Sequence, residues 1–167
     1  MKVSCSCDKP IGDSNCVGCG QCAAVCPTGA IIIKNDSHRL WKELNQEDTI
    51  AVAQVAPAVR VAVAKEFGYN GENVMGKIVA ALRRIGFNYI FDTSTAADLT
   101  VMEESKAFAD RLANGGKLPL FTSCYHAWIK YAENEYPEIL PNISTCRSPM
   151  QMFASVINEK FKGGGKK

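Results

Sequence analysis

Apolar residues follow two different patterns along the chain, which change near residue 49. Residues 1 to about 34 show little periodicity, whereas the later part alternates short apolar runs with longer amphipathic stretches. The run Ile50–Val55 is rich in β-branched residues, and Pro57 follows it; this favours a buried strand and then a helix with proline in its first turn. The polar stretch 36–48 carries apolar residues at helical spacing and predicts a short connecting helix.

The later part repeats this order of strand and helix. Residues 73–85 place their apolar side chains on one face and stop at Gly86, which predicts a helix. Thr95–Asp98 resembles a capping box and predicts the start of a helix that ends near Asn114. Ser148 followed by Pro149 predicts another helix start. The remaining predicted elements are a helix from Pro57 to Gly68, strands at 87–91 and 118–122, and a helix at 125–135.

Alternating strands and helices imply right-handed crossovers and a parallel sheet. The predicted fold class is therefore α/β, with a small parallel sheet of three to four strands and flanking helices. The 167 residues are 47% hydrophobic and 22% charged, which is typical of a soluble globular protein. A net charge of +2 does not suggest nucleic-acid binding, and no apolar run is long enough to cross a bilayer.

Cysteine is the unusual component. The chain has eight cysteines, and six of them lie in the first 26 residues. The N-terminus shows no signal peptide, so we expect a cytoplasmic protein, or one of an anaerobic organelle matrix in a eukaryote. In a reducing compartment, clustered cysteines are metal ligands more often than disulfides.

The segment Cys16–Pro27 reads C-x2-C-x2-C-x3-C-P, the bacterial ferredoxin pattern for a [4Fe–4S] cluster. Gly18 and Gly20 permit a tight turn that leaves backbone N–H groups free for the sulfurs. Zinc sites usually use two separated cysteine pairs, so zinc is the weaker interpretation. Residues 1–35 are accordingly predicted to be a ferredoxin-like [4Fe–4S] segment, followed by the connecting helix at 36–48, a lobe at 49–161 and a disordered tail at 162–167.

The number of cysteines limits the number of clusters. Two cubanes would need eight ligands, so one [4Fe–4S] cluster is expected, on Cys16, Cys19 and Cys22. In two-cluster ferredoxins the cysteine before the proline serves the other cluster. The fourth ligand is therefore Cys5, Cys7 or a locally recruited Cys26, and all three alternatives stay open.

Several stretches resemble [FeFe]-hydrogenases, in that family's order and spacing. They are Gln54–Arg60, Gly76–Phe87, Ala97–Glu104, Phe121–Cys124 and Ser148–Phe153, preceded by the second ferredoxin-type motif at Asp13–Pro27. The resemblance implies one lobe of the hydrogenase catalytic domain. Members split or make H2 at a cubane bridged to a di-iron centre, which needs four cysteines from three motifs. The second and third motifs would fall beyond residue 167, so whether this chain is an enzyme stays open.

The first of the three motifs is altered. The family reads T-S-C-C-P, whereas this chain has Thr122, Ser123, Cys124, Tyr125 and His126. The resemblance assigns Cys124 to a proton-relay position. Tyr125 then stands where the family has the cysteine that binds the cubane. The resemblance also assigns Glu104 and Ser144 to the proton path, while Ala107 replaces a further glutamate. Tyr125 or His126 as a substitute ligand is a minor hypothesis.

Simpler interpretations apply to other residues. Gly71–Lys77 matches G-x4-G-K, but Ile78 replaces the magnesium-binding hydroxyl, so nucleotide binding is not expected. Cys146 is interpreted as a small buried hydrophobe. His126 and Glu104 could be ordinary surface groups.

Four functions compete. The first is an electron-transfer module with one cubane, docking onto other redox subunits or ferredoxin-like carriers. The second is a subunit of a split hydrogenase whose partner chain carries the missing lobe. The third is a non-catalytic iron–sulfur sensor or assembly protein, and the fourth is a truncated gene product. The first is preferred, without hydrogen turnover by this chain alone.

Overall fold

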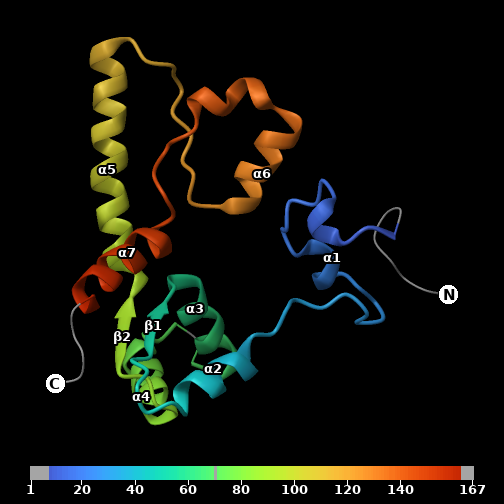
Figure 1. Cartoon of the computed structure of the whole chain (residues 1–167), viewed down its shortest axis with the longest axis vertical. Coiled ribbons are helices and arrows are strands. Elements are labelled where there is room, and N and C mark those ends of the chain that lie inside the picture. Colours follow the sequence, from blue (N-terminus) through green and yellow to red (C-terminus); the bar gives the residue numbers. More distant parts are fainter. Residues whose placement is uncertain (1–7, 70, 163–167) are drawn as a thin grey trace. The chain divides into compact units, whose positions relative to one another are not determined.

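The computed structural model describes residues 8–69 and 71–162 (Figure 1). Cys5, Cys7 and the predicted tail from residue 163 onward lie outside the described residues. The helical elements are η2 (Ile11–Asp13), α1 (Gln21–Ala24), α2 (Ser37–Leu44), α3 (Pro57–Glu66), α4 (Met75–Ile85), α5 (Thr93–Asn114), α6 (His126–Glu135), η3 (Pro137–Asn142) and α7 (Pro149–Phe161). Two compact units are present: residues up to Asn35 with Lys106–Cys146, and Asp36–Ser105 with Arg147 onward.

The sheet belongs to the second of these units. Strands β1 (Val52–Val55) and β2 (Tyr89–Asp92) pair in parallel, with Val52 opposite Tyr89. The described residues form a two-stranded sheet, so the parallel α/β class is confirmed, although the sheet is smaller than predicted.

One face of this sheet carries the core of the unit. Phe153 and Ile157 of α7 and Ala96 of α5 are buried there together. Phe91 of β2 packs edge-on against Phe153, with ring centroids 5.2 Å apart. Because successive side chains of a strand point to opposite faces, the face of β2 that carries Phe91 is the one packed against α7.

The predicted third strand at 118–122 is reduced to one bridge. Phe121 pairs in parallel with Ile143, donating its N–H to the Asn142 carbonyl at 2.9 Å. Pro119 and Pro141 lie two residues before the bridged positions and have no N–H to extend the ladder. This lack of donors explains why the pairing does not grow into a strand.

The beginning of α5 also differs from the prediction. The helix starts at Thr93, two residues before the expected capping box at Thr95. The Asp92 carboxylate accepts the Ser94 N–H at 2.8 Å and binds Arg60 at 3.0 Å. That hydrogen bond from Ser94 is the main cause that lowers the pKa of Asp92. The last residue of β2 therefore supplies the oxygen expected from Thr95.

Other helix limits agree with the local signals. Gly86 ends α4 in the left-handed conformation (φ 119°), and Pro57 opens α3. The Ser148 hydroxyl accepts the Gln151 N–H at 3.4 Å, with Pro149 at the first position of α7.

Arg111 connects several segments of the unit that contains Lys106–Cys146. Its guanidinium donates to the carbonyls of Lys117, Asn142 and Ile143, each at 3.1 Å. Arg111 of α5 therefore binds both the segment that follows this helix and the end of η3. The helix α6 and η3 lie beside one another in this unit (Figure 1).

Candidate iron–sulfur site

The cysteine segment is a loop shaped by two glycines. Gly18 and Gly20 have φ values of 73° and 77°, in the left-handed region that other residues rarely adopt. The Gly20 carbonyl accepts the N–H groups of Ala23 and Ala24, each at 3.1 Å, and so begins α1. The glycines therefore turn the chain twice between Cys16 and Cys22, as the spacing predicts.

The four thiols of the loop differ in exposure. Cys19 and Cys22 are exposed, whereas Cys16 and Cys26 are half-buried. Cys26 Sγ lies 3.5 Å from the Thr28 hydroxyl. This hydrogen bond, aided by backbone N–H groups of Ile31 and Thr28, lowers the pKa of Cys26 to about 7. Because iron binds thiolates, the shift favours the form that a cluster requires.

The donor set fits a [4Fe–4S] cluster. Iron in such clusters takes thiolate ligands, and this loop offers four within eleven residues, with glycines at the turns. Within residues 8–69 and 71–162, no three Cys, His, Asp or Glu side chains are grouped closely enough to hold a metal ion. The loop thus offers thiols of the type that a cluster requires, and closing them around iron requires local adjustment.

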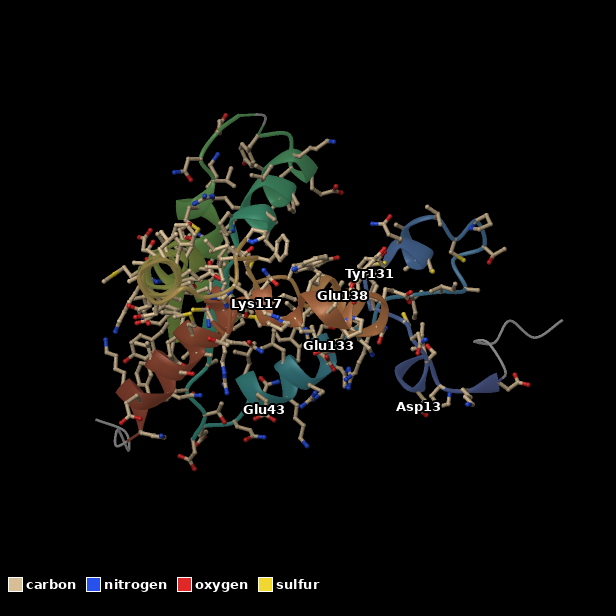
Figure 2. The ribbon with its side chains drawn as sticks, turned by 90° about the horizontal axis from the view of Figure 1, so that it is seen from above. Asp13, Glu43, Lys117, Tyr131, Glu133 and Glu138 are labelled. Carbon is tan, nitrogen blue, oxygen red and sulfur yellow. The ribbon has the colours of Figure 1, made fainter. Side chains whose placement is uncertain are left out.

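Helix α6 contacts this loop at two points. His126, its first residue, has Nε2 3.6 Å from the position that a Cβ on Gly18 would occupy. Near the other end of the helix, the Asn134 amide donates to the Asn15 carbonyl at 3.2 Å. Tyr131 and Glu133 of the same helix are labelled in Figure 2. Residues more than a hundred positions apart in the sequence therefore meet at the cysteine loop.

The altered motif lies immediately before α6. Cys124 is exposed, and Tyr125 is 51% exposed at the N-cap position, with its ring edge-on to His126. The Ser123 hydroxyl donates to the Cys146 carbonyl, a contact that joins the two segments beyond the Phe121 bridge. Tyr125, which the resemblance assigns to the cubane-ligand position, is therefore an exposed residue.

The three residues predicted to belong to a proton path do not share one environment. Ser144 is buried, and its hydroxyl accepts the Cys146 N–H at 3.1 Å. Cys124 belongs to the same compact unit, whereas Glu104, half-buried on α5, belongs to the other. Cys146 is half-buried, whereas the sequence predicted a buried residue.

The G-x4-G-K segment has a structural arrangement. Lys77 Nζ lies 3.4 Å above the Tyr69 ring and 3.4 Å from a Glu72 carboxylate oxygen. The lysine is thus occupied by its own chain, and α4 is preceded by a loop and not by a strand. This supports the interpretation that the segment does not bind phosphate.

Comparison with known families places this geometry in context. Residues 10–32 match a model described as a 4Fe-4S binding domain. Residues 49–166 match the model for the iron only hydrogenase large subunit, C-terminal domain. The chain belongs to the iron-only hydrogenase large-subunit family, as its motifs imply.

The relatives are much longer than this chain. It is 44% identical to "NADP-reducing hydrogenase subunit HndD" of Solidesulfovibrio fructosivorans, over 87% of this chain and 26% of that protein. It is 43% identical to the periplasmic [Fe] hydrogenase large subunit of Nitratidesulfovibrio vulgaris, over 85% of this chain and 42% of the relative. The chain thus spans between about a quarter and two-fifths of these hydrogenases.

The chain is also similar to an iron–sulfur assembly protein and to a hydrogenase of known structure. Cytosolic iron-sulfur assembly component 3 of Bos taurus is 31% identical over 88% of this chain and 33% of its own length. Among solved structures, apo [FeFe]-hydrogenase HydA1 from Chlamydomonas reinhardtii aligns with a TM-score of 0.68 at 36% identity, covering 78% of this chain and 35% of that one. The observed fold is therefore part of the hydrogenase fold.

Sequence reasoning missed the contact between His126 and Gly18. The available signal was a histidine in place of the family's proline, directly after the altered ligand position. No local pattern connects that position to a turn 108 residues earlier, so the contact could be found only in the folded structure.

Proposed function

We propose that this protein transfers electrons through one [4Fe–4S] cluster on the Cys16–Cys26 loop and does not activate H2 by itself. The observation that carries the proposal is a contrast within one unit. The ferredoxin-type loop keeps every cysteine of its pattern, whereas the active-site motif has Tyr125 at the cubane-ligand position.

The residues of the loop have distinct tasks in this mechanism. Cys16, Cys19 and Cys22 hold the cluster, with Cys26, Cys5 or Cys7 completing it. The turns at Gly18 and Gly20 leave backbone N–H groups available for the sulfurs. When bound, the cluster supplies one-electron oxidation and reduction. The exposure of Cys19 and Cys22 supports exchange at the surface with a partner protein.

The proposed partners are other redox subunits or ferredoxin-like carriers in the cytoplasm. The similarity to a subunit of an NADP-reducing hydrogenase supports placement in a multi-subunit redox complex. The net charge of +2 gives no reason to include nucleic acid among the partners. In the described residues, no helix is long and apolar enough to cross a membrane.

Anaerobic reconstitution of the full chain tests the proposal. We expect about four irons and four sulfides per chain, and one S = 1/2 signal after reduction. Hydrogen evolution from reduced viologen should stay at the level of the Cys19→Ser variant. An iron content well above four, or hydrogen evolution above that control, would contradict the proposal.

A subunit of a split hydrogenase is a second candidate. Cys124, Ser144 and Glu104 are retained at the proton-path positions, which an electron carrier does not need. In this case a partner chain would supply the further cysteines that the catalytic cluster requires. Mixing the reconstituted chain with such a partner should then produce hydrogen evolution that depends on Cys124, whereas the electron carrier gives none.

Iron–sulfur assembly is a third candidate, favoured by the 31% identity to cytosolic iron-sulfur assembly component 3. An assembly protein passes its cluster to an acceptor, whereas an electron carrier keeps the cluster through repeated reduction and oxidation. Incubation with an apo-ferredoxin acceptor separates the two functions. Retention of the iron on this chain supports electron transfer, and quantitative passage of the cluster supports assembly.

A further inference from the structure

His126 is one side chain of α6 that lies beside the cysteine loop. Its Nε2 and Cδ2 atoms lie 3.6 and 3.9 Å from the position of a Cβ on Gly18. Gly18 is in the turn between Cys16 and Cys19, so the imidazole lies beside the turn between two predicted cluster ligands. Apart from the two chain neighbours of Gly18, no other atom of the described residues lies within 4 Å of that position.

A second contact fixes α6 near the same turn. The Asn134 amide donates to the carbonyl of Asn15, directly before Cys16. His126 in the first turn and Asn134 in the last turn of the helix therefore both contact the segment around Cys16. Two contacts from one helix restrict its movement relative to the loop more than one contact would.

Position 126 also departs from the motif that the resemblance implies. The family's T-S-C-C-P has proline there, and proline provides neither a side-chain donor nor an aromatic ring. An imidazole supplies a polar N–H and a flat ring beside the turn. The potential of a [4Fe–4S] cluster depends on nearby hydrogen-bond donors and on its exposure to water.

We propose that His126 is a positioning residue of the iron–sulfur site, which packs on Gly18, holds the turn between Cys16 and Cys19, and raises the cluster's reduction potential. The inference rests on the proposed one-cluster function. Its physical cause is the polar edge of the ring, because a donor near the cluster stabilises the additional negative charge of the reduced state. His126 acts through the loop and is not a ligand.

His126→Pro is the direct test. Proline suits the first position of a helix, so α6 should persist while the imidazole is removed. In the reconstituted full chain, we expect an unchanged iron content and a reduction potential shifted to more negative values, measured by EPR-monitored redox titration. His126→Gln, which keeps an N–H donor, should recover part of the shift and also serves if the proline variant loses helix.

The chain contains two histidines, which gives a matched control. His38 is exposed on α2 in the other compact unit. His38→Ala should leave the potential unchanged. With 15N-labelled histidine, the reduced cluster should show a weak 15N coupling that persists in His38→Ala and disappears in His126→Pro.

The outcomes separate this inference from the proposed function. A wild-type chain that binds no cubane overturns both. A normal iron content with the same potential in wild type and His126→Pro overturns the role of His126 alone. A 15N coupling as strong as that of an iron-bound imidazole also overturns it, because His126 would then be a ligand.

Discussion

The cysteine loop and the segment Phe121–His126 lie in the same compact unit, but they differ in how well they keep their family pattern. The loop retains all four cysteines and has left-handed glycines where the turns require them. The second segment is bridged to Ile143 through Phe121, and it carries Tyr125 and His126 where the resemblance expects cysteine and proline. The two segments of one unit therefore differ in whether cysteine stands at every position where the resemblance expects a metal ligand.

This contrast predicts that iron binding depends on one segment only. Cys19→Ser should abolish cubane formation, because a serine hydroxyl is a poor substitute for a thiolate ligand. Cys124→Ser should leave iron and sulfide content unchanged. The measurement is iron and sulfide per chain after anaerobic reconstitution, with the EPR signal of the reduced protein as a second readout. Loss of iron in Cys124→Ser would remove the distinction between the two segments.

A core substitution in the other unit should reduce stability without affecting the ligands. Phe153 packs edge-on against Phe91 in the buried cluster with Ala96 and Ile157. Phe153→Ala should lower the free energy of unfolding by about 3–5 kcal/mol, since it removes a large side chain and leaves a cavity. Urea unfolding followed by circular dichroism measures this. The exposed Phe67, at 71% exposure, is the matched control, and Phe67→Ala should cost far less.

A glycine substitution tests whether the loop geometry matters for binding. Gly20 has φ 77°, and an added Cβ would meet only Ile33 Cδ1 at 4.0 Å. Gly20→Ala therefore introduces backbone strain with little steric conflict, about 1–2 kcal/mol. We expect slower reconstitution and faster loss of iron to a chelator.

Gly12 is the control for this substitution. An added Cβ at Gly12 would meet nothing within 4 Å, and its φ is not positive. Gly12→Ala should reconstitute at the wild-type rate. Equal rates in both variants would show that the left-handed turn is not required for cluster binding.

Local signals anticipated much of the fold. Ser148–Pro149 at the start of α7, Gly86 at the end of α4 and Pro57 at the start of α3 were all predictable. Each depends on interactions within a few residues: a hydroxyl accepting a nearby N–H, a left-handed glycine, and a ring that fixes φ.

The features that sequence did not reveal depend on distant contacts. The strand at 118–122 became a single bridge because its partner segment also carries a proline before the paired residue. The contact of His126 with Gly18 depends on how α6 packs in its unit. For the candidate site, the cysteine spacing identified the loop, whereas the neighbours that surround the loop could not be predicted.

The smallest expected effect concerns Asp92, at the junction of β2 and α5. Hydrogen bonds from the Ser94 N–H and the Ser94 hydroxyl, and then the charge of Arg60, lower the pKa of this carboxyl below its ordinary value. A carboxyl with a lowered folded-state pKa stabilises the protein above its unfolded pKa, and that contribution is lost as the pH falls through the folded-state value. Asp92→Asn should therefore destabilise the chain by up to about 1 kcal/mol at neutral pH, since the side chains of Asp92 and Arg60 are 30% and 29% exposed. The difference from wild type should shrink on acidification, as measured by urea unfolding between neutral and acidic pH. A difference that stays constant with pH would mean that packing at the junction, and not the carboxylate charge, begins α5 at Thr93.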